Sequence, residues 1–202
     1  MSDLFNALSD KLKEGYKAVL EDWGNDAYLV KLPTSEVKGS SNLKNRFKVM
    51  RKLFRKSLDA TRDSLRDENG NETQRLELVR KLECSFFKKR KTYKPYYNVL
   101  VRGEYAAQTL LNEWEQKTAV SKLREKEDFG EIKKFKRQSF RWFFGVTLRT
   151  KFKESHADMR TEGLGKVKIV LNGLRRCRIF KNYGIELPEV EESMEEVEQA
   201  NE

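Results

Sequence analysis

The chain has 202 residues, of which 42 are Lys or Arg and 32 are Asp or Glu, giving a formal net charge of +10. Its length fits one sizeable domain or two small ones. No apolar run approaches the roughly 20 residues that span a bilayer, and the start resembles neither a signal peptide nor a transit peptide. The two cysteines, Cys84 and Cys177, form no metal motif. We therefore expect an intracellular protein, cytoplasmic or nuclear, without an integral membrane segment.

Acidic residues are concentrated at the C-terminus. Residues 185–202 contain eight Glu and no Lys or Arg, so residues 1–184 carry all 42 basic residues and 24 acidic ones, a net charge of +18. This asymmetry predicts a basic domain over residues 1–184 and a disordered acidic tail over residues 185–202. A domain so strongly charged favours a polyanionic partner, and a merely solvated surface is the alternative.

Apolar residues at steps of three and four predict a first helix over residues 4–23, with Gly24 as its stop. Residues 28–30 fit a short strand. Pro33 and the Ser- and Gly-rich residues 38–41 mark a loop before the next helix.

Two further helices are predicted in the next part of the chain. The first begins at Asn42, has an apolar stripe that ends at Leu65, and is followed by a turn at residues 69–71. The second covers about residues 72–91, where apolar residues recur every three or four positions. Residues 96–101 also fit a short strand, but an isolated strand has nothing with which to pair, so a helical fold is favoured.

Three more helices are predicted in the second half of the basic domain, over residues 104–126, 129–154 and 166–183. The middle one carries two separate apolar stripes. Such a pattern indicates either a central helix packed on both sides or a helix that docks a second copy of the chain. Taken together, the elements predict an all-α, single-domain bundle of about six helices.

Residues able to support catalysis are sparse. The single histidine, His156, has Asp158 nearby in a predicted loop, and such a pair among charged neighbours is usually a surface feature. Asp59, Asp63 and Asp67 share one helical face, but arginines three or four positions away explain them as ion pairs. We therefore expect a protein that is not an enzyme and that holds no metal or cofactor.

The strongest functional signal is a row of basic residues on the second predicted helix. Four of them lie within about 60° of arc and a fifth lies just outside that arc. The row extends over three helical turns, roughly 16 Å, which matches several successive phosphates of a nucleic acid. These residues are Lys44, Lys48, Arg51, Arg55 and, outside the arc, Lys52.

Three further blocks extend this basic character. The first mixes cations with tyrosines, a combination typical of single-strand binding, although the same tyrosines also fit a core cluster. The second lies on the fifth predicted helix, and the third is rich in arginine, which suits bidentate phosphate contacts. In chain order the blocks comprise Lys88, Lys89, Arg90, Lys91, Tyr93 and Tyr96; Lys133, Lys134, Arg137 and Arg141; and Arg175, Arg176 and Arg178.

These patterns predict non-catalytic, largely sequence-independent binding of nucleic acid, with RNA slightly favoured over DNA. A packaging, nucleocapsid-like or silencing-suppressor protein of a virus or mobile element, or a ribonucleoprotein subunit, fits this description. The alternative is a matrix-like or scaffold protein that binds an anionic membrane or an acidic protein and self-associates. The nucleic-acid hypothesis requires that the basic blocks converge on one surface once the chain folds.

Overall fold

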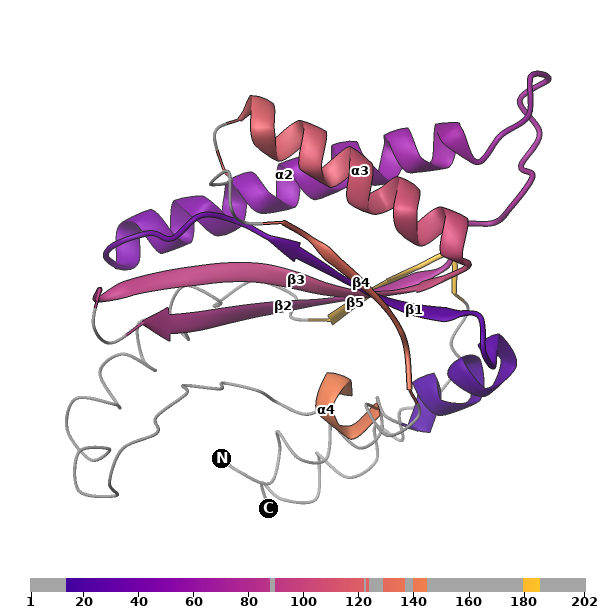
Figure 1. Cartoon of the computed structure of the whole chain (residues 1–202), viewed down its shortest axis with the longest axis horizontal. Coiled ribbons are helices and arrows are strands. Elements are labelled where there is room, and N and C mark those ends of the chain that lie inside the picture. The colour runs from indigo at the N-terminus through magenta and orange to yellow at the C-terminus, as the bar shows by residue number, and fades with distance from the viewer. Residues whose placement is uncertain are drawn as a thin grey trace, which may run out of the picture.

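The protein is a sheet of five antiparallel strands with helices packed on both of its faces (Figure 1). The computed structural model describes residues 14–87, 90–121, 123, 129–136, 140–144 and 180–185. The strands are β1 (Ala27–Pro33), β2 (Leu78–Phe87), β3 (Thr92–Arg102), β4 (Glu131–Lys134) and β5 (Phe180–Tyr183). The helices are α2 (Ser40–Ser64), α3 (Glu104–Val120) and the short α4 (Phe140–Phe144), and residues 14–23 are also helical.

Strand order and connectivity define the architecture. The order in the sheet is β4-β1-β3-β2-β5, and each pair of neighbours is antiparallel. Because β1 and β2 both run antiparallel to β3, they are parallel to each other, and α2 connects them across the inserted strand. In the same way, α3 connects β3 to β4 across β1. This β-α-β-β-α-β connectivity is the split βαβ, or ferredoxin-like, arrangement, here with β5 added beside β2.

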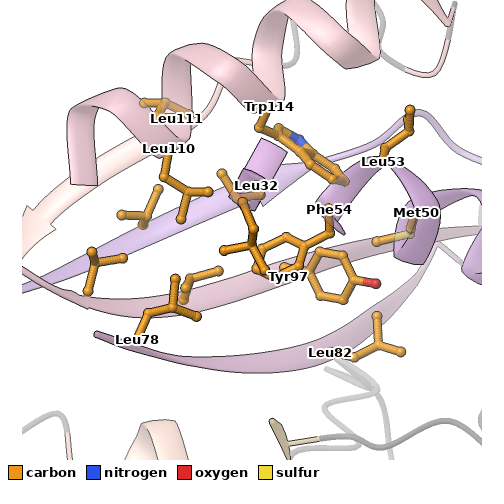
Figure 2. Packing of buried hydrophobic residues seen from close by; sticks show 14 of the residues in the cluster. Leu32, Met50, Leu53, Phe54, Leu78, Leu82, Tyr97, Leu110, Leu111 and Trp114 are labelled. Carbon is orange, nitrogen blue, oxygen red and sulfur yellow. The ribbon is translucent and has the colours of Figure 1, made fainter. Parts of the chain in front are cut away.

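Helices α2 and α3 run antiparallel to each other over one face of the sheet, and the main core lies between them and the strands (Figures 1 and 2). Phe54 of α2, Tyr97 of β3 and Trp114 of α3 meet at its centre with ring centroids 5.0 to 6.4 Å apart. The Trp114 indole Nε1–H donates a hydrogen bond of 3.0 Å to the carbonyl of Pro33, which satisfies the one polar atom of that buried ring.

A second apolar cluster covers one end of the opposite sheet face. It joins the helix of residues 14–23 to α4 through Tyr16, whose ring stacks on that of Phe144 at 4.9 Å. Val79 and Leu100 supply the sheet side of this cluster, and Phe180 of β5 packs against it. None of the helices in the described part of the chain combines the length and apolar character needed to cross a membrane.

The expectation of an all-α bundle is wrong, and the main error concerns residues 72–91. The strand β2 occupies most of this segment and pairs with β3 along its whole length. Apolar side chains lie on both faces of β2, and the buried charged residues Arg80, Lys81 and Glu83 interrupt the strict alternation that marks a strand. The remaining apolar spacing therefore resembles that of a helix.

The predicted helix over residues 129–154 is also wrong within the described residues. Residues 131–134 form β4, which pairs with the edge of β1, and only residues 140–144 are helical. Among the described residues, the two predicted apolar stripes do not form. Ile132 joins the main core, whereas Phe143, predicted on the same stripe, joins the second cluster together with Phe144 from the other stripe. Pairing with a distant strand therefore overrides the local helical pattern.

The sixth predicted helix is wrong at its end, since its last residues form β5, and residues 166–179 lie outside the described ranges. Other elements are confirmed. Residues 14–23 are helical up to Gly24, residues 28–30 lie within β1, and α2 and α3 begin within two residues of their predicted starts. The strand suggested at residues 96–101 is real as part of β3, because β1 and β2 are its partners.

Candidate nucleic-acid interface

The amphipathic helix α2 exposes a row of cations. Its apolar side, which includes Leu43, Phe47 and Phe54, is buried against the sheet, so the opposite side faces solvent. Six basic side chains on that side are exposed, and the first and fifth of them are separated by roughly 16 Å along the helix axis. We call these residues the basic face: Lys44, Lys48, Arg51, Lys52, Arg55 and Lys56.

The charges of the basic face are not neutralised by the protein's own described residues. None of its six side chains forms an ion pair within the ranges that the structure describes. The C-terminal part of α2 differs, because Arg62 lies 4.0 Å from Asp59 and Arg66, just beyond the helix, lies 3.9 Å from Asp63. The positive charge is therefore concentrated over the first two thirds of α2. Of the three aspartates considered in the sequence, Asp59 and Asp63 form ion pairs, whereas Asp67 accepts hydrogen bonds from two asparagines in the turn after the helix.

The turn between β2 and β3 lies beside the start of α2. Val37 and Tyr93 exchange two backbone hydrogen bonds of 2.8 Å, and the Arg90 guanidinium lies 2.8 Å from the Glu36 carboxylate. Lys91 is exposed in the same turn, with a φ of 52°. Two of the basic blocks in the sequence, those of α2 and of this turn, therefore meet at one end of the molecule (Figure 1). Lys88 and Lys89 lie outside the described residues.

A hollow of about 570 Å³ opens beside the basic face at this end. Arg46 forms part of its wall and is held in place, because its Nη1 donates to Ser35 Oγ at 2.9 Å and to the Leu123 carbonyl at 3.3 Å. Burial lowers the pKa of Arg46 from its ordinary value. The complete lining is Glu36, Val37, Lys38, Asn42, Asn45, Arg46, Val49, Ser121 and Leu123.

The two tyrosines proposed as stacking platforms lie elsewhere. Tyr93 is only 4% exposed and packs against Phe86 on the α2 side of the sheet. Tyr96 is half-buried on the opposite face, where the Lys31 ammonium lies 5.3 Å from its ring centroid. Burial, together with the charge and hydrogen bonding of Glu83, raises the pKa of Tyr96 above its ordinary value. The structure thus separates both rings from the basic face.

The block on β4 lies apart from the basic face. Lys133 and Lys134 are exposed on this edge strand, and Lys133 Nζ is 2.6 Å from the Glu131 carboxylate. Lys133 lines a smaller hollow of about 220 Å³ together with Tyr96 and Asn98. Because α3 contacts β1 and β4 whereas α2 contacts β3, helix α3 lies between this block and α2. The described residues of the β4 block and the basic face therefore do not form one surface, and the expected convergence of the basic blocks is not found between them.

Four of the predicted binding residues lie outside the described residues: Arg137, Arg175, Arg176 and Arg178. Arg141 belongs to α4. Sequence reasoning missed Lys56, which follows Lys52 by four residues and therefore extends the same helical row. It also missed the hollow beside the row, whose walls come from residues 36–49 and from residues 121–123, far apart in the sequence.

No group of three or more His, Cys, Asp and Glu side chains is arranged to hold a metal ion within the described ranges. Comparison of the chain with protein-family models, with curated proteins and with solved structures finds no match.

Proposed function

We propose that this protein binds nucleic acid, RNA or DNA, without catalysis and largely without sequence preference. The continuous surface expected from all the basic blocks is not found among the described residues, so the proposal is narrowed to α2. One observation carries it: six exposed cations occupy one side of α2, and no described carboxylate neutralises them. A row of charges about 18 Å long, from Lys44 to Lys56, can contact several successive phosphates and release their counterions. Phosphate contacts of this kind position a protein on nucleic acid but read no sequence.

An anionic membrane is a weaker candidate for the same face. A helix that lies on a membrane buries its apolar side among the lipids. In α2 that side is already packed against the sheet, and the exposed side carries only one half-exposed apolar residue, Val49. The geometry therefore favours an extended polyanion over a lipid surface.

A charge-reversal experiment tests the proposal. The triple variant Lys48→Glu, Arg51→Glu, Arg55→Glu should lose most of its affinity for a fluorescent RNA or DNA oligonucleotide, measured by anisotropy at fixed salt. These side chains are exposed, so the variant should keep the circular dichroism spectrum of the unmodified protein. All sequences should be affected alike.

A second triple variant serves as the matched control. Lys17→Glu, Lys133→Glu, Lys134→Glu changes the net charge by the same amount at exposed positions away from α2. It should retain much more affinity than the α2 variant. Equal losses in both variants would show that only the total charge matters, and unchanged affinity in the α2 variant would exclude the basic face as the site. Binding of anionic vesicles but not of oligonucleotides would favour the membrane alternative.

A further inference from the structure

The hollow beside the basic face differs chemically from the face itself. The basic face consists of cations alone, whereas the hollow is mixed. Six of its nine lining residues are polar or charged, among them the amides Asn42 and Asn45, and three are apolar: Val37, Val49 and Leu123. Its volume of about 570 Å³ falls within the range of small-ligand sites, roughly 300 to 1,000 Å³. Apolar side chains beside amide groups can contact the flat face and the polar edge of a planar group, and a phosphate has no such flat face.

Helical geometry places the hollow directly beside the cations. Asn45, Val49, Lys52 and Lys56 follow one another at steps of four, three and four residues, so they lie on the same side of α2. A strand whose phosphates follow the basic face would therefore carry its sugars and bases past the opening of the hollow. Val49 is 41% exposed, so an apolar surface is available there.

The far wall of the hollow is held by fixed contacts. Arg46 connects Ser35 to the Leu123 carbonyl, and the pairing of Val37 with Tyr93 fixes the segment before α2. Glu36 contributes a carboxylate to the lining, but it is engaged by Arg90 and by the Thr92 hydroxyl. A hollow that already has its shape before binding loses less conformational entropy when a ligand enters.

We infer that this hollow receives one unstacked base of a nucleic-acid strand whose phosphates lie along the basic face, so that the protein prefers single strands to duplexes. The inference rests on the proposed function. A base in a duplex is paired and stacked and cannot enter, whereas a single strand can turn one base aside. The Asn45 amide can donate to and accept from a base edge, and Asn42, whose Nδ2 already donates to the Lys38 carbonyl at 2.9 Å, can accept through its Oδ1.

The probes are three fluorescent oligonucleotides of equal length: a single strand, its duplex, and an abasic strand that keeps the phosphates but lacks the bases. Anisotropy titrations at equal salt should give about three- to tenfold tighter binding of the single strand than of the abasic strand, the effect of one or two net hydrogen bonds. Two variants should each reduce the ratio of single-strand to abasic-strand affinity toward one. Val49→Met narrows the hollow and keeps a residue that favours helix, and Asn45→Ala removes an amide from its wall. Both should leave duplex affinity unchanged.

Asn112→Ala is the control for the asparagine variant, because Asn112 is exposed on α3, away from the hollow, and its side chain accepts a 2.9 Å hydrogen bond from Gln108. It should leave the ratio unchanged. Equal affinity for the single and abasic strands, or a ratio unaffected by Val49→Met, would overturn the inference. In that case loss of binding in the α2 charge-reversal variant would still support the proposed function. If the unmodified protein binds none of the probes, the proposed function itself fails.

Discussion

The Lys81 ammonium lies 2.6 Å from the Glu83 carboxylate on β2, and these side chains are only 2% and 6% exposed. Both point to the sheet face opposite α2 and α3. The Lys81 ammonium lies 5.9 Å from the ring centroid of Phe143 in the second cluster, and Glu83, two residues further along the strand, shares its face. The second Glu83 oxygen accepts a hydrogen bond of 2.9 Å from Asn98 Nδ2 on the neighbouring strand. The sheet therefore contains a buried charged pair that side-chain contacts fix across two strands.

Replacement of one partner in this pair should strongly destabilise the fold. Lys81→Met leaves the Glu83 charge buried without its counterion, and loss of one partner of a buried pair costs about 3–5 kcal/mol. The double variant Lys81→Met, Glu83→Gln removes both charges, so it should lose less stability than the Lys81→Met single variant. Urea denaturation followed by circular dichroism gives these free energies. A single variant as stable as the unmodified protein would contradict the prediction.

Gly184 should tolerate alanine less well than Gly70. Both have left-handed backbones, with φ of 68° and 82°, so alanine strains either position by about 1–3 kcal/mol. At Gly184, however, an added Cβ would lie 2.3 Å from the carbonyl oxygen of Leu76, whereas at Gly70 nothing lies within 4 Å. Gly184→Ala should therefore lower the denaturation midpoint further than Gly70→Ala. Equal shifts would mean that β5 moves away from β2 at little cost.

The helices α2 and α3 could be predicted from the sequence because their information is local. In α2 the apolar residues repeat with the helical period and the cations occupy the other side, so one pattern specifies both the helix and the basic face. The exposure of Lys48, Arg51 and Arg55 therefore follows directly from the packing of residues such as Phe47 and Phe54.

The strand β2 could not be predicted in the same way. Arg80 is 5% exposed and lies over the rings of Phe54 and Tyr97, at 5.3 and 4.6 Å from their centroids, while Lys81 pairs with Glu83. In the sequence these charges indicate a solvated surface. Their partners come from α2 and β3 or depend on the strand geometry itself, so they become visible only in the folded chain.

The arrangement of the candidate site was also only partly accessible to sequence reasoning. The basic face is a property of one helix and was found. Two other features depend on contacts between distant segments and were not found. One is the turn that carries Arg90, which lies beside the basic face, and the other is the hollow lined in part by Ser121 and Leu123. The sequence also grouped Tyr93 and Tyr96 into one binding block, and this was wrong. Side chains alternate along β3, so the two rings lie on different faces of the sheet.

Cys84 should be chemically inert in the folded protein. Burial raises the pKa of its thiol from an ordinary value of 9.0 to about 12, and only the thiolate is reactive. At neutral pH, alkylation by iodoacetamide should therefore be slow in the native state and much faster in urea. Mass spectrometry of the peptide that contains Cys84 separates its reaction from that of Cys177.

The same shift predicts an effect of pH on stability. Between pH 9.0 and about 12 the unfolded chain releases the Cys84 proton that the folded chain retains, so this thiol lowers stability as the pH rises through that interval. Below pH 9 the thiol is protonated in both states and has no such effect. Cys84→Ala should show a smaller alkaline decrease in the free energy of unfolding. An identical decrease in both proteins would contradict the assigned burial.

The salt dependence of binding should report how many cations of the basic face contact phosphates. If all six do so, the logarithm of the affinity should fall with the logarithm of salt concentration with a slope of roughly −4 to −5, since each contact contributes about 0.7 to 0.9. Lys48→Ala should make the slope shallower by about one contact. Lys117→Ala is the control, because Lys117 on α3 is already paired with Glu113 at 2.6 Å. Equal changes in slope for the two variants would place the bound phosphates away from α2.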